Sequence, residues 1–181
     1  PPMIVINAMG AAIFVKALSL QRRLREQRDS TQARRILSIA SQTVAHLRGG
    51  LTPDSARATA AIILAETGVA AVAITGETTI LAHVGVGEDH HQAGAHWRTK
   101  GTRLAFEKGT ALFLHDRDSI GCDAADCPLR EAIIVPLRKG KAIRGCLKIY
   151  GTKDRPLDQP LFELAKGLAE HSIAAYSTDI T

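Results

Sequence analysis

The chain has 181 residues, 45% apolar and 23% charged, enough for one globular domain and a smaller segment. Its net charge of +5 is concentrated between Lys16 and Arg35, where seven basic and two acidic residues lie, and the rest of the chain is neutral. A nucleic-acid partner is therefore not expected, since the charge is not spread over the folded part and aromatic residues, at 4%, are too few for base stacking.

Residues 1–50 predict the end of a transmembrane helix followed by a basic juxtamembrane linker helix. Met3–Val15 is an uncharged apolar run that is shorter than the roughly 17–25 residues of a complete span. We interpret it as the end of a last membrane helix, because the basic cluster after it follows the positive-inside rule. A signal peptide is not favoured, since its charges would come first. The helix predicted from Lys16 to about Arg48 is a signalling linker, a coiled-coil stalk or an ordinary amphipathic helix, and Gly49-Gly50 ends it.

Residues 51–170 predict a folded domain, and residues 171–181 a divergent tail. Thr52 is a plausible N-cap, Pro53 suits the first helical position, and Gly68 suits a left-handed C-terminus. The expected elements, in chain order, are a helix 53–67, strands 69–75 and 79–84, a helix 99–107, a short strand 111–115, strands 132–137 and 142–150, and a helix 157–176.

The segment Glu131–Tyr150 predicts the hairpin that organises the sheet. Its first strand is apolar on both sides, so we expect it in the interior of the sheet. Its second strand alternates, with Cys146 and Lys148 opposite Leu147 and Ile149, as in a half-buried strand. Antiparallel strands with helices before and after them predict an α+β fold, with an antiparallel sheet and helices packed at one side.

Several stretches then carry a family resemblance. HLRGGLTPDSARATAAIILAETGVAAVAITGETTILAHVGVGEDHH, CPLREAIIVPLRKGKAIRGCLKIY and LAKGLAE resemble the cytoplasmic GAF-like domain of LytS-type sensor histidine kinases, the group that includes LytS, BtsS and YpdA. NAMGAAIF resembles the end of the last membrane helix in that group.

The resemblance implies a GAF-like domain on the cytoplasmic face of the bacterial cell membrane, in a homodimeric receptor. It also implies a kinase module elsewhere in the parent chain, which phosphorylates its own histidine from ATP and passes phosphate to a LytTR-type response regulator. No such histidine segment or Gly-rich ATP lid follows here, so no catalytic activity is expected of this chain itself.

Six side chains are candidate ligand-binding residues, and we expect any ligand between the two loops that carry most of them. These residues are His83, His90, His91, Arg98, Cys122 and Cys127. A pocket for an anion or small metabolite and a solvated loop are both consistent with the histidines. No metal site is assigned, because adjacent histidines do not easily share one ion and their spacing fits no standard zinc pattern. Two thiolates could nevertheless join two histidines around zinc, or form a reversible disulfide.

Three cysteines form no obvious disulfide framework and favour a reducing, cytoplasmic location. The acidic neighbours of Cys122 and Cys127 would raise the pKa of both thiols. The leading interpretation is a sensory or signal-relay domain without turnover. The alternatives are a cysteine-dependent GAF-type enzyme, such as a free methionine-(R)-sulfoxide reductase, and a metal- or redox-sensing module. The sequence names neither a cofactor nor a ligand.

Overall fold

The computed structural model describes residues 14–23, 34, 36–43, 45–46 and 50–176. The chain divides into two compact units, residues 1–35 and 36–181. Residues 14–23 of the first unit are helical, and within the described residues no helix is long and apolar enough to cross a membrane. Most of Met3–Val15, and Gly49 of the expected boundary, lie outside the described residues.

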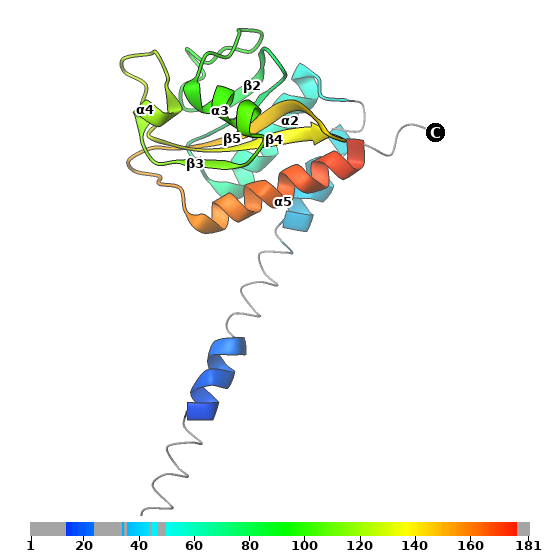
Figure 1. Cartoon of the computed structure of the whole chain (residues 1–181), viewed down its shortest axis with the longest axis vertical. Coiled ribbons are helices and arrows are strands. Elements are labelled where there is room, and N and C mark those ends of the chain that lie inside the picture. The colour runs from blue at the N-terminus through cyan, green and yellow to red at the C-terminus, as the bar shows by residue number, and fades with distance from the viewer. Residues whose placement is uncertain (1–13, 24–33, 35, 44, 47–49, 177–181) are drawn as a thin grey trace, which may run out of the picture. The chain divides into compact units, whose positions relative to one another are not determined.

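The second unit is built on a five-stranded sheet in which every pair of neighbours is antiparallel (Figure 1). The strand order is β2-β1-β5-β4-β3. The strands are β1 (Ala71–Thr75), β2 (Ile80–Gly85), β3 (Leu112–Leu114), β4 (Glu131–Lys139) and β5 (Ala142–Gly151). The predicted hairpins are therefore β1–β2 and β4–β5, and β4 is an interior strand as expected.

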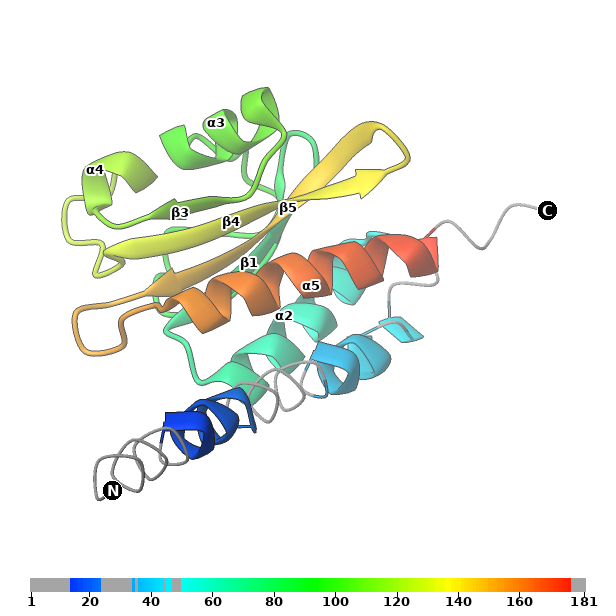
Figure 2. The same cartoon turned by 60° about the horizontal axis from the view of Figure 1, so that its bottom comes forward.

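Helices cover both faces of this sheet. The two longer ones, α2 (Pro53–Thr67) and α5 (Gln159–Tyr176), pack on one face, and α3 (Lys100–Lys108) and the short α4 (Arg117–Ile120) on the other (Figure 2). The α+β GAF-like fold is confirmed. The prediction that helices pack at one side of the sheet holds for α2 and α5. On the other side, α3 and α4 add a second apolar layer that the sequence did not indicate.

That second layer corrects the prediction for β5. Leu147 and Ile149 face the core beneath α2 and α5, while Cys146 and Tyr150 belong to the core beneath α3. Lys148, which the alternation placed on a solvated face, is only 3% exposed. From Gly145 to Gly151 the strand is buried on both faces, because α3 and the loops around it cover the side that was expected to meet water.

Helix ends follow the predicted signals. Thr52 and Ser55 cap the start of α2 reciprocally, and Gly68 ends it at φ 69°. Residues 36–43 are helical, and Ile39 and Ala40 are buried in the core beneath α2 and α5. The compact unit thus takes in part of the predicted linker helix.

Candidate functional site

A tight turn after β2 brings two neighbouring histidines together. Gly87 lies in the left-handed region at φ 87°, and its carbonyl oxygen accepts from the backbone N–H groups of His90 (3.3 Å) and His91 (3.0 Å). A Cβ on Gly87 would lie 3.3 Å from a ring atom of each histidine. Glycine therefore gives the turn both its backbone angle and the space that the two rings occupy.

The rings of this turn stack against the sheet. His91 stacks on His83 of β2, with ring centroids 4.9 Å apart, and its ring is nearly parallel to that of Tyr150 on β5. His90 and His91 have centroids 4.3 Å apart. His83 donates its Nε2–H to the carbonyl oxygen of Val86 at 2.9 Å, so that nitrogen is engaged within the turn.

Two cysteines meet the histidines from the other side. Cys122 follows α4, and its Sγ lies 3.6 Å from Nε2 of His91. Cys127 is 1% exposed, and its backbone N–H donates to the Ala124 carbonyl, which also accepts from the Arg117 side chain. One potential ligand atom from each of four residues lies within 4.8 Å of every other; these residues are His90, His91, Cys122 and Cys127, called the His/Cys cluster below.

Burial sets the charge state of these groups. Desolvation lowers the pKa of His91 to about 3, and the charges of His83, His90 and Lys148 act in the same direction. Desolvation also lowers the pKa of His83 and raises that of the Cys127 thiol. At neutral pH His83 and His91 are thus neutral imidazoles, and Cys127 is a protonated thiol.

The third cysteine is chemically separate. Cys146 on β5 is completely buried, and desolvation raises the pKa of its thiol to about 12. It is outside the His/Cys cluster and unsuited to nucleophilic chemistry.

Sequence reasoning missed two members of this site, Lys148 and Tyr150. Both lie on the face of β5 that carries Cys146, and the Lys148 Nζ is 5.7 Å from the centre of the Tyr150 ring and 3.4 Å from the Thr99 hydroxyl. The available signal was a lysine and a tyrosine within the otherwise apolar run that ends β5. Because that side of β5 was expected to be solvated, Lys148 and Tyr150 were not recognised as candidates.

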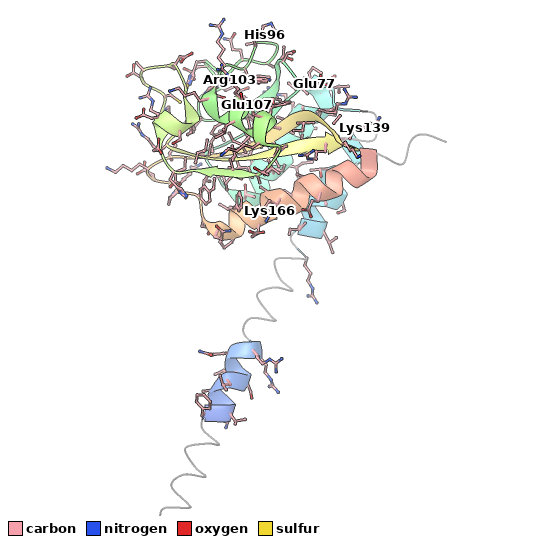
Figure 3. All side chains as sticks on the ribbon, in the orientation of Figure 1. Glu77, His96, Arg103, Glu107, Lys139 and Lys166 are labelled. Atoms are coloured by element: carbon pink, nitrogen blue, oxygen red, sulfur yellow. The ribbon has the colours of Figure 1, made fainter. Side chains whose placement is uncertain are left out.

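Of the six candidate residues, the structure gathers five and places Arg98 elsewhere. Arg98 is exposed and lines an open basin of about 420 Å³ that reaches Cys122 from the solvent side. Three further basic residues and two aspartates line it: Lys100, Arg103, Arg117, Asp118 and Asp123. Figure 3 labels Arg103 on α3 and His96 on the preceding loop; the His96 Nδ1 is 3.2 Å from the Thr78 carbonyl oxygen. The basin is an anion-compatible surface beside the cluster.

Known proteins resemble this chain both in sequence and in fold, although no protein-family model matches it. The sensor protein LytS of Staphylococcus epidermidis is 39% identical over 168 residues, which cover 93% of this chain and 28% of that protein. The sensor histidine kinase/phosphatase LytS of Staphylococcus aureus is 37% identical over 168 residues, 93% of this chain and 29% of that protein. This chain spans less than a third of the length of these relatives.

Solved structures give the fold. The GAF domain of a phosphoenolpyruvate-protein phosphotransferase from Coxiella burnetii superposes with a TM-score of 0.62 at 15% identity, covering 79% of this chain and 93% of that one. A free methionine-R-sulfoxide reductase of Staphylococcus aureus, determined with its substrate, has a TM-score of 0.58 at 16% identity, covering 78% and 95%. At such identities the likeness concerns the fold alone. The sequence matches and the fold together establish that this chain is a GAF-like region of the LytS family of sensor proteins.

Proposed function

We propose that this chain is the sensory or signal-relay GAF domain of a membrane-bound two-component sensor histidine kinase, without turnover of its own. The observation that carries the proposal is the match to LytS sensor proteins along 93% of the chain. The site supports it, because buried imidazoles and thiols on two converging loops suit reversible binding.

The fold offers a physical route from the site to the end of the domain. Strand β5 places Lys148 and Tyr150 beside the histidines, and on its opposite face Leu147 and Ile149 pack in the core that α5 covers. A change at the His/Cys cluster that shifts β5 would therefore also displace α5. Closely packed cores transmit such shifts instead of absorbing them.

The partners of this domain follow from the same assignment. We expect a homodimer at the cytoplasmic face of the cell membrane, attached through its N-terminal helix. A kinase module of the parent chain would receive the signal, and a LytTR-type response regulator would receive the phosphate. A small-molecule ligand at the candidate residues His83, His90, His91, Arg98, Cys122 and Cys127 stays a prediction.

The test uses the complete gene product in membrane vesicles with labelled ATP. His91→Ala removes the ring that contacts both Tyr150 and Cys122, and we expect it to change the rate of autophosphorylation. His96→Ala, an exposed histidine of the same loop, is the control and should leave the rate unchanged. An identical rate in wild type, His91→Ala and Tyr150→Phe would contradict a sensory or relay role for this site.

A thiol-dependent enzyme is the alternative, and the closeness of Cys122 and Cys127 is the observation that favours it. Burial keeps the Cys127 thiol protonated, which argues against an activated pair. The assay is thioredoxin-coupled reduction of free methionine-(R)-sulfoxide by the chain. Activity that disappears in Cys122→Ser would replace the signalling proposal with the enzymatic one.

A further inference from the structure

The His/Cys cluster has the composition and spacing of a closed metal site. It offers two imidazole nitrogens and two sulfurs, and all four ligand atoms lie within 4.8 Å of one another. A tetrahedral zinc ion with Zn–S near 2.3 Å and Zn–N near 2.0–2.1 Å holds its ligand atoms about 3.3–3.8 Å apart. The His91 Nε2 and the Cys122 Sγ, at 3.6 Å, are already at that separation. Closing the remaining gaps requires movements of about 1 Å.

His90 has the arrangement expected of a metal-ligating histidine. Its Nδ1 lies 2.9 Å from the Asp89 carboxylate, which is an acceptor, so Nδ1 carries the proton and Nε2 is the nitrogen with the free lone pair. Within the described residues, that Nε2 is buried and has no hydrogen-bond partner. A carboxylate behind one imidazole nitrogen with a metal at the other is the usual outer-shell pattern of zinc histidines.

Charge and ligand type select the metal. Two thiolates neutralise a dication, so the loaded centre adds no net charge to a site where Lys148 is already buried nearby. Sulfur and imidazole ligands disfavour calcium and magnesium, which take oxygen, and a tetrahedral set of two sulfurs and two nitrogens is typical of zinc. A small organic anion would leave the unpartnered His90 Nε2 and the two thiols without a role.

We propose that His90, His91, Cys122 and Cys127 form a tetrahedral zinc site that joins the turn after β2 to the loop after α4. Adjacent His90 and His91 can share one ion here, because the turn at Gly87 brings a ligand atom of each histidine to the same point. This inference goes beyond the proposed signalling role and is independent of it, since zinc binding can be measured without any kinase.

The first experiment measures metal in the 181-residue chain, purified under reducing conditions after growth with added zinc. Elemental analysis should find about one zinc per chain. His91→Ala, Cys122→Ala and Cys127→Ala should each lower the zinc affinity by roughly tenfold or more, and Asp89→Asn by roughly 10–100-fold. The matched controls are Cys146→Ala and His96→Ala, which keep the cluster and should keep full zinc content.

The second experiment replaces zinc with cobalt, whose spectrum reports geometry and ligand type. We expect the d–d bands of tetrahedral cobalt together with a thiolate-to-cobalt charge-transfer band, and loss of that band in Cys122→Ala. Cys122 is only half-buried, so this variant tests the site even where the buried Cys127→Ala fails to fold.

Four results would overturn the proposal. One is wild-type chain without zinc after titration with zinc under reducing conditions. Another is zinc content that survives in both Cys122→Ala and His91→Ala. The third is a cobalt spectrum without thiolate charge transfer. A loss of zinc that also occurs in the Cys146→Ala control would likewise assign the metal elsewhere.

Discussion

Gly87 provides a test of the site that separates backbone strain from contact with the histidine rings. Gly87 and Gly94 both adopt φ 87°, so an alanine at either position meets a similar unfavourable backbone angle, on the order of 1–3 kcal/mol. The surroundings differ. Around Gly94 no described atom beyond its neighbours would lie within 4 Å of the new Cβ, whereas at Gly87 that Cβ would lie 3.3 Å from both His90 and His91.

The added methyl group of Gly87→Ala cannot be accommodated by a simple ring rotation. The His91 ring stacks on His83 and lies nearly parallel to the Tyr150 ring, and the His83 Nε2 would itself lie 3.7 Å from the new Cβ. Overpacking of this kind destabilises a folded protein by about 1–3 kcal/mol. Gly87→Ala should therefore lower the free energy of unfolding by that amount more than Gly94→Ala does.

The assay is urea denaturation in the presence of a chelator, followed by the fluorescence of Trp97, the single tryptophan, which stacks on Phe106. The chelator removes any contribution of bound metal, so the difference between the two variants reports apo packing alone. Equal free energies of unfolding for Gly87→Ala and Gly94→Ala would refute the close packing of this turn.

Three further predictions concern the fold. Gly145→Ala should lower the melting temperature much more than Gly76→Ala does. A Cβ on Gly145 would overlap the Thr75 carbonyl oxygen between β1 and β5, whereas a Cβ on Gly76 would meet only Leu81 at 3.6 Å. Similar melting temperatures for the two variants would contradict the β1–β5 register. The Ser119 hydroxyl and backbone N–H lower the pKa of Asp116, the N-cap of α4, so this carboxylate stabilises the fold above its unfolded pKa of about 3.9 and that contribution is lost as the pH falls through the folded value. Asp116→Asn should therefore show a smaller drop in melting temperature between about pH 5 and pH 3, and an unchanged drop would show that the cap does not form. A chain lacking residues 1–35, the first compact unit, should remain soluble with a cooperative melt. Removal of residues 1–50 also deletes the buried Ile39 and should lower the melting temperature. Equal melting temperatures would show that Ile39 does not contribute to stability.

Local sequence signals determined most of the secondary structure. Thr52, Pro53 and Gly68 bound α2 because a hydroxyl cap, a fixed φ and a left-handed terminus act within one turn of chain. The period-2 pattern and the turn at Gly140 located the hairpin of β4 and β5, because alternation and a left-handed turn residue also act over a short stretch of chain. Signals of this range need no partner from elsewhere in the fold. The four-residue α4 was missed, since so short a helix has too few residues for a period.

The faces of the sheet and the geometry of the site were decided by tertiary structure. Alternation along β5 separates its two sides but does not say what covers each, and only the packing of α3 reveals that Lys148 and Tyr150 are buried beside the histidines. The sequence identified His90, His91, Cys122 and Cys127 as candidates by residue type alone. Their convergence depends on the local left-handed turn at Gly87 and on the loop after α4, which brings Cys122 to His91, a residue 31 positions earlier in the chain. Spacing along a chain cannot encode such a meeting, because the intervening fold sets the distance.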